Sequence, residues 1–192
     1  MKIEVSALSK SYDGKDVLKD FNAVFEDGSK TLLTGRSGIG KTTLLHILMD
    51  LAEPDSGNVV ISDKQMSFGA VFQEDRLLEY LTAEQNIELI RPAPSGEDIT
   101  SDLKRLIPDI DPAAPVSSLS GGMKRRVAVI RACLSKSDVL VMDEPFTGLD
   151  DASRAEVIRY IEDRRDGRTL IIASHTTDGM DGYRRIEIPE IE

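Results

Sequence analysis

The chain has 192 residues, 40% hydrophobic and 30% charged, a composition typical of one soluble globular domain. Its 34 acidic and 24 basic residues give a formal net charge of −10, which argues against general affinity for nucleic acid or an anionic membrane surface. The single cysteine, Cys133, excludes an internal disulfide, and no apolar run approaches the roughly 18 residues that a membrane-spanning helix needs.

Two strands joined by a turn are predicted at the beginning of the chain. Residues 2–8 and 22–25 alternate polar and apolar side chains, as half-buried strands do, and Asp13-Gly14 is a turn signal between them. Antiparallel pairing is therefore expected here. Tyr12 lies in the turn, where it can either stack on an adenine ring or remain a surface residue.

A glycine-rich loop follows the apolar segment 31–34 and precedes a helix predicted over residues 42–51. Strand, loop and helix are the context in which such a loop binds phosphate, through curled backbone N–H groups and the positive helix N-terminus. Lys41 can reach the β- and γ-phosphates, Thr42 can offer its hydroxyl to Mg²⁺, and Thr43 can support the α-phosphate. The predicted ATP-binding residues of this loop are Gly35, Arg36, Ser37, Gly38, Ile39, Gly40, Lys41, Thr42 and Thr43.

The middle of the chain changes from strands to helices. Short strands are predicted over residues 59–61 and 67–72, and Gln73 follows the second of them. An amide at that place can touch Mg²⁺ or an attacking water, although a surface role fits it equally. From about residue 74 to residue 132 helical stretches such as 83–90 and 96–107 predominate, which predicts a helical lobe inserted into the core.

Two continuous apolar runs, residues 139–142 and 169–174, are typical of strands covered on both faces, and a helix is predicted between them over 152–165. The order of a strand, a helix and a second strand predicts a parallel sheet. Asp143 and Glu144 end the first run. Asp143 can hold Mg²⁺ through water and Glu144 can act as the general base, unless they are only a solvated acidic pair. His175 follows the second run and can donate to the γ-phosphate or be an ordinary loop histidine.

Taken in order, these residues resemble the ATPase domain of ATP-binding cassette (ABC) transporters over essentially the whole chain. The counterparts of the family motifs are Tyr12, the Walker A loop 35–42, the Q-loop Gln73, the signature Leu119, Ser120, Gly121, Gly122 and Met123, Walker B at 139–144, the D-loop Gly148, Leu149 and Asp150, and the switch His175.

The resemblance implies an α/β P-loop NTPase with a RecA-like parallel-sheet core, an N-terminal antiparallel β subdomain and an inserted α-helical signature subdomain. Residues 1–192 would form a single ABC ATPase domain, with the insert at about 74–132. Two chains would dimerise head to tail on binding ATP and Mg²⁺, so that Ser120 to Gly122 of one contact the γ-phosphate of the other and Asp150 helps to align the interface.

Three departures from the family pattern stand out. Met123 replaces the more usual glutamine, Gly148 replaces alanine in the D-loop, and the segment after His175 is too short for a regulatory domain, so metabolite sensing within this chain is not expected. Residues 71–78, 121–123 and 142–146 are similar to the nitrate, sulfonate and taurine importer branch.

The resemblance further implies an ATP-hydrolysing subunit, peripheral on the cytoplasmic face of the cell membrane. It would drive import through separate integral membrane permease subunits, with a solute-binding protein as a further partner and without nucleic acid. A soluble ABC protein of translation or DNA maintenance is the alternative. A small nucleotide kinase is a third possibility, but it leaves residues 119–122 and the Asp143-Glu144 pair unexplained.

Overall fold

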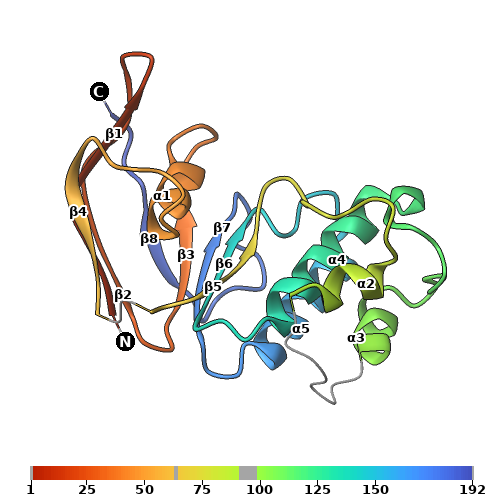
Figure 1. The fold of residues 1–192 in the computed structure, drawn as a ribbon. Helices are drawn as coiled ribbons and strands as arrows, with labels where there is room; N and C mark the ends of the chain where they lie inside the picture. The colour runs from red at the N-terminus through yellow and green to blue at the C-terminus, as the bar shows by residue number, and fades with distance from the viewer. Residues whose placement is uncertain (1, 63–64, 91–98, 192) are drawn as a thin grey trace.

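The computed structural model describes residues 2–62, 65–90 and 99–191. Two sheets stand side by side, and most of the helices cover the far side of the second one (Figure 1). The first sheet is antiparallel, with the strand order β2-β1-β4, and the second is parallel, with the order β5-β6-β7-β3-β8. The parallel core and the N-terminal antiparallel sheet expected from the sequence are both present.

The bounds of the elements are as follows. The strands are β1 (Lys2–Tyr12), β2 (Lys15–Glu26), β3 (Lys30–Thr34), β4 (Ser56–Ile61), β5 (Phe68–Val71), β6 (Val139–Asp143), β7 (Thr169–Ala173) and β8 (Arg184–Glu187). The helices are α1 (Lys41–Leu48), α2 (Ala83–Glu88), α3 (Ile99–Leu106), the short 3₁₀ helix η1 (Val116–Ser118), α4 (Gly121–Leu134) and α5 (Asp151–Arg164).

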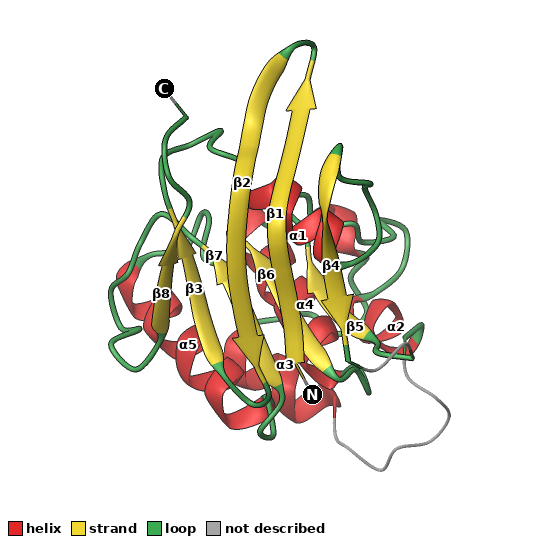
Figure 2. Ribbon diagram, turned by 90° about the vertical axis from the view of Figure 1, so that its left-hand side faces the viewer, coloured by secondary structure: helices red, strands yellow, loops and turns green. Residues whose placement is uncertain are grey.

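Strands β1 and β2 are much longer than the sequence pattern predicts, and they form the tall hairpin of Figure 2. The pairing shifts register after Val5, and Ala7 and Asp20 have left-handed backbones with φ of 47° each. Such bulges turn side chains out of the alternating pattern without ending the strand. The prediction from alternation therefore found only part of each strand.

Helix α1 ends at Leu48, three residues before the predicted end at Leu51. Asp50 takes the left-handed conformation (φ 58°), so its N–H bonds to Ile47 O and the N–H of Leu51 bonds to His46 O at 2.8 Å. This pair of bonds is the Schellman arrangement that closes a helix, usually with glycine at the left-handed position. Because an aspartate occupies that position here, the sequence carried no clear stop signal before Pro54.

The parallel sheet separates two hydrophobic layers. Along β6, Val139 and Val141 face α1 and the antiparallel sheet, whereas Leu140 and Met142 face α4 and α5. All four side chains are fully buried, and each contributes about 1.5–3 kcal/mol of burial free energy. Helix α1 is thus packed between the two sheets, which fixes the loop in front of it.

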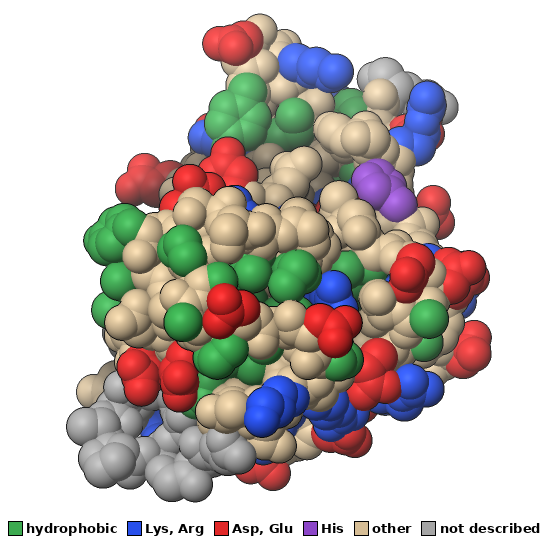
Figure 3. Space-filling model, turned by 90° about the vertical axis from the view of Figure 1, so that its right-hand side faces the viewer, with side chains coloured by type: hydrophobic (Ala, Val, Ile, Leu, Met, Phe, Trp, Pro, Cys, Tyr) green, Lys and Arg blue, Asp and Glu red, His purple; other side chains and the backbone are tan. Residues whose placement is uncertain are grey.

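All of α2, α3, η1 and α4 occur in the chain between β5 and β6. They lie on the side of the parallel sheet opposite the antiparallel sheet (Figure 1). On this side of the molecule, hydrophobic side chains gather at the surface between acidic and basic ones (Figure 3). Of the helix predicted over 96–107, residues 96–98 lie outside the described part of the chain, and α3 covers most of the remainder.

Candidate functional site

The strand order of the parallel sheet brings four predicted segments to one edge. Neighbouring strands pair Val71 with Met142, Asp143 with Ala173, and Ala173 with Leu33. Because the strands are parallel, the residues that follow β5, β6, β7 and β3 all leave the sheet at the same carboxyl edge, where ligands bind in open α/β sheets.

The glycine-rich loop begins directly after β3 and ends in α1. Gly40 has φ of 109°, and a side-chain carbon there would lie 2.4 Å from the carbonyl oxygen of Val17, so only glycine fits. Lys41 is buried, and its Nζ donates to the carbonyl oxygens of Gly35 at 2.8 Å and Arg36 at 3.1 Å. The lysine ammonium is thereby held inside the loop, facing the space that the loop encloses.

Thr42 and Asp143 meet across the sheet edge. The Thr42 hydroxyl donates to Asp143 Oδ2 at 2.6 Å, although the two residues lie 101 positions apart. Asp143 is the last residue of β6 and is buried. Hydroxyl, carboxylate and amide oxygens are the ligands that Mg²⁺ prefers in proteins. This pair, with Gln73 at the same cavity, fits a magnesium ion.

Glu144 and His175 form the second polar pair. Glu144 has a left-handed backbone (φ 48°), and its N–H donates to Ala173 O at 2.8 Å. His175 Nε2 lies 3.1 Å from Glu144 Oε1, and the His175 backbone N–H donates to Oε2 at 3.4 Å. Burial raises the pKa of Glu144, while the positive charge of a protonated His175 opposes that rise. The raised pKa makes this carboxylate a better proton acceptor than an exposed one.

One cavity of about 300 Å³ unites these groups. Its lining contains most of the predicted catalytic, metal-binding and phosphate-binding residues: Ser37, Gly38, Gly40, Lys41, Thr42, Thr43, Gln73, Asp143, Glu144 and His175. A loop of backbone donors, a buried ammonium, a hydroxyl–carboxylate pair and a carboxylate with raised pKa can together bind a nucleotide phosphate chain and activate water.

Tyr12 and Arg36 lie away from the lining of this cavity. Tyr12 is half exposed at the tip of the β1–β2 hairpin, with Lys10 Nζ 5.3 Å from the centre of its ring. Arg36 and Ile39 instead line a hollow of about 210 Å³ on the other side of the loop, together with Lys15 and Val17. Stacking of Tyr12 on adenine therefore stays a prediction.

Residues 119–123 also lie outside the cavity lining. Ser120 caps α4, where its Oγ accepts from the N–H of Met123 at 3.3 Å. A side-chain carbon at Gly122 would lie 3.1 Å from Gly148 O, so the signature segment packs against the D-loop. Asp150 caps α5, and the N–H of Ser153 lowers the pKa of its carboxyl. The structure thus forms two clusters: the phosphate cavity, and the signature with the D-loop.

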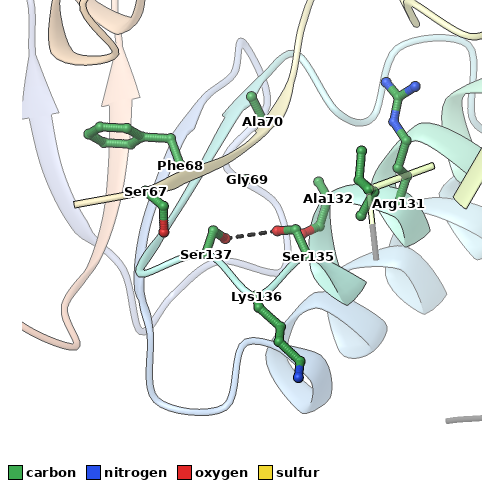
Figure 4. Close-up of a pocket in the computed structure, with 10 residues that line it drawn as sticks. Ser67, Phe68, Gly69, Ala70, Arg131, Ala132, Ser135, Lys136 and Ser137 are labelled. Carbon is green, nitrogen blue, oxygen red and sulfur yellow. Dashed lines mark hydrogen bonds between the residues drawn. The ribbon is translucent and has the colours of Figure 1, made fainter. Parts of the chain in front are cut away.

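Another hollow, of about 310 Å³, lies at the edge strand β5 (Figure 4). Ser135 and Ser137 point toward each other there, with 2.8 Å between their hydroxyl oxygens. Arg131, at its rim, donates to the carbonyl oxygens of Asp75 and Arg76. These polar groups are engaged within the protein, and the hollow contains none of the predicted site residues.

The sequence of residues 18–147 matches the ABC transporter family. The chain belongs to this family. This ABC cassette is 37% identical over 80% of its length to the molybdenum import ATP-binding protein ModC of Rhizobium etli, covering 49% of that protein. It is 32% identical over 92% of its length to the aliphatic sulfonates import ATP-binding protein SsuB 2 of Agrobacterium fabrum, covering 71%. The chain thus spans about half the length of several curated relatives that it matches.

Solved structures agree with this family. The dimeric post-hydrolysis cassette MJ0796 bound to ADP and Pi superposes with a TM-score of 0.81 at 26% identity, covering 96% of this cassette and 93% of that chain. A putative ABC transporter ATP-binding protein from Pyrococcus furiosus, at 23% identity, shares the fold with a TM-score of 0.84 over 98% of both chains. The cassette fold expected from the sequence is confirmed.

Proposed function

We propose that this chain hydrolyses ATP in the cavity built on Lys41, Thr42, Asp143 and Glu144. The observation that carries the proposal is the Glu144–His175 pair, which places a carboxylate of raised pKa opposite the phosphate loop. ATP would lie with its β- and γ-phosphates along the loop. Mg²⁺, when bound, neutralises charge on the phosphate oxygens, and Thr42, Asp143 and Gln73 are the residues that would hold it, partly through water.

Each residue of the cavity has a distinct task. Glu144 accepts the proton of the attacking water, because its carboxylate is partly desolvated and therefore more basic. His175 orients that carboxylate and can donate to the γ-phosphate. Lys41 transfers its hydrogen bonds from the carbonyl oxygens of Gly35 and Arg36 to phosphate oxygens, so its charge is already in place before the nucleotide arrives.

The test is Glu144→Gln, which removes the base but keeps the size and hydrogen-bonding shape of the side chain. Phosphate release should fall by about 10²–10⁴-fold, while binding of a fluorescent ATP analogue persists. Glu187→Gln, on exposed β8 and outside the cavity, is the matched control and should stay near the wild-type rate. Hydrolysis by Glu144→Gln at the wild-type rate would contradict the general-base role.

We propose that ATP closes a head-to-tail homodimer, and that the site described above is complete only in that dimer. The signature segment belongs to the other cluster, so it is free to contact a nucleotide held by a second chain. The N-terminus of α4 at Ser120 offers backbone N–H groups and the positive end of the helix to a γ-phosphate. The solved MJ0796 cassette, which is dimeric, supports this arrangement.

None of the helices in the described part of the chain combines the length and the hydrophobicity that a membrane span requires. We propose that the cassette drives import through a separate membrane permease, from the cytoplasmic face and together with a solute-binding protein. The names of ModC and SsuB 2, both import ATP-binding proteins, support this. Four large hydrophobic side chains are also exposed in the segment between β5 and α3, where a protein partner could cover them: Leu78, Tyr80, Leu89 and Ile90.

A pull-down in mild detergent tests the partner. Tagged chain should retain a membrane permease, and Tyr80→Asp, which places a charge on a side chain that is 76% exposed, should retain less of it. Lys19→Gln, on the exposed part of β2, lowers the net charge by the same single unit and is the control. Absence of any permease would favour a soluble ABC protein of translation or DNA maintenance instead.

A further inference from the structure

Arg125 is a buried charged residue in the first half of α4 that binds the backbone around Gln73. Its side chain is 7% exposed. One terminal nitrogen donates to Phe72 O at 2.6 Å and the other to Gln73 O at 2.5 Å, and its Nε lies 3.2 Å from the carboxylate of Asp75. Arg125 lies 53 positions after Phe72 and 52 positions after Gln73 in the sequence, so the contact joins two distant segments of the chain.

The same helix holds the next part of this loop with a second arginine. Arg131 donates to Asp75 O at 3.0 Å and to Arg76 O at 2.8 Å. Arg76 has a left-handed backbone (φ 47°), and its guanidinium lies 3.6 Å from the centre of the Phe72 ring. The main chain on both sides of Gln73 therefore takes its position from α4 as well as from β5.

Gln73 itself reaches the phosphate cavity that Asp143 and Glu144 line. Its side chain is exposed, whereas its carbonyl is bound by Arg125. Arg125 also lies on the helix that Ser120 caps, so a rigid element joins the signature segment to the Q-loop. A shift of α4 would move the Gln73 carbonyl with it.

We propose that Arg125 is a positioning residue for ATP hydrolysis, which fixes the main chain of Gln73 to the signature helix and thereby sets where the Gln73 amide stands in the cavity. The proposal rests on the hydrolytic function proposed above. Arginine suits this task because its planar fork donates to two successive carbonyls at once, while lysine offers a single point charge. In a closed dimer, the helix that contacts the nucleotide of the partner would then also position Gln73 in its own site.

The experiment is a double-mutant cycle with Arg125→Lys and Gln73→Ala. Arg125→Lys should lower kcat by about tenfold and leave the KM for ATP within about twofold, because misplacement of a group by about 1 Å costs up to about 10²-fold. In the Gln73→Ala background the same change should cost less than about twofold, since non-additivity identifies residues that act through one another. Thermal unfolding of each variant checks the fold. If Arg125→Lys does not fold, Arg125→Gln, which keeps one amide donor, replaces it.

Arg131→Lys is the matched control, because it removes the same kind of two-carbonyl contact from the same loop beyond Gln73. Its loss of kcat should be several-fold smaller than that of Arg125→Lys. Equal losses of kcat in Arg125→Lys and Arg131→Lys, or additive losses in the double-mutant cycle, would show that the loop is loosened in general. Either result would overturn the inference about Arg125 and leave the proposed ATP hydrolysis intact. A Gln73→Ala variant that hydrolyses ATP as fast as wild type would also overturn the inference. If the wild-type chain has no ATPase activity, both the inference and the proposed function are wrong.

Discussion

The charge state of Glu144 is set by its neighbours in the cavity, and it determines the pH at which the site works. Burial raises the pKa of Glu144 most; His175 and Lys41 lower it, and Asp143 raises it. The active form of a general base is the deprotonated one, so activity is lost as the pH falls through this pKa. Since the pKa is raised, the acid limb of the rate profile should lie above the ordinary range of glutamate.

Replacement of His175 by alanine should move that limb to still higher pH, because a charge that lowers the pKa of Glu144 is removed. The pH dependence of kcat for wild type and His175→Ala measures the shift. His46→Ala is the control, since His46 lies outside the cavity lining, near the Phe72 ring, and should leave the limb in place. A limb at the same or lower pH in His175→Ala would show that the histidine does not act on Glu144.

At the residue scale, the sequence indicates side chains that come directly after a buried strand. It does not indicate side chains whose role depends on a contact with a distant segment. Asp143 and Glu144 end an apolar run, and the phosphate loop has a characteristic spacing, so both can be predicted without any knowledge of contacts. Arg125 was missed because its partners are backbone carbonyls of a distant loop, which no spacing indicates. Arg125 stands in the basic run Lys124-Arg125-Arg126, so its charge did not distinguish it from residues of a solvated helix face.

Strand β5 illustrates how tightly two elements approach at the edge of the parallel sheet. Gly69 faces the turn after α4, and a side-chain carbon there would lie 2.3 Å from Ser135 Oγ, 2.6 Å from Ser137 Oγ and 2.9 Å from Ala132 O (Figure 4). These distances are far shorter than van der Waals contact, so any added atom must push the turn away from the strand.

Gly69→Ala should therefore lower the free energy of unfolding by about 1–3 kcal/mol, the usual cost of overpacking. Denaturant unfolding measures this. Adding Ser135→Ala and Ser137→Ala should recover part of the loss, because the two clashing hydroxyls are removed. Gly121→Ala, where no described atom beyond the adjoining residues and the backbone of α4 lies within 4 Å of the added carbon, should leave the stability nearly unchanged. A Gly69→Ala chain as stable as wild type would mean that the turn moves freely.

At the element scale, the hydrophobic pattern of the sequence predicted the buried strands. It did not predict strands in which that pattern is interrupted or missing. Strands β6 and β7 were predicted within a residue at each end, because both of their faces are covered. Strand β8, at the sheet edge, carries mostly exposed and charged side chains and was not predicted at all. Helix α4 begins at Gly121, because the Ser120 cap lets both glycines adopt helical geometry.

At the scale of the whole molecule, the two clusters of predicted site residues lie on different parts of the fold. The phosphate cavity stands at the carboxyl edge of the parallel sheet, whereas the signature segment begins α4 and packs against Gly148 of the D-loop. The sequence pattern of one chain cannot show which chain's signature segment contacts a given nucleotide, because that depends on how the chains assemble. In the proposed two-fold dimer, each chain would provide one half of two identical sites.

Ser120→Arg tests this arrangement at the scale of the assembly. A long cation at the start of α4 would occupy the position of the partner's γ-phosphate, so hydrolysis should fall by at least about 10²-fold, while a single chain still binds ATP. In the Glu144→Gln background, ATP should produce a dimer in size-exclusion chromatography that Ser120→Arg abolishes. Ser118→Arg, an exposed serine two residues earlier in η1, is the control and should still dimerise. If Ser120→Arg hydrolyses ATP normally, the signature does not complete the site of a second chain, and each chain must hold a whole site.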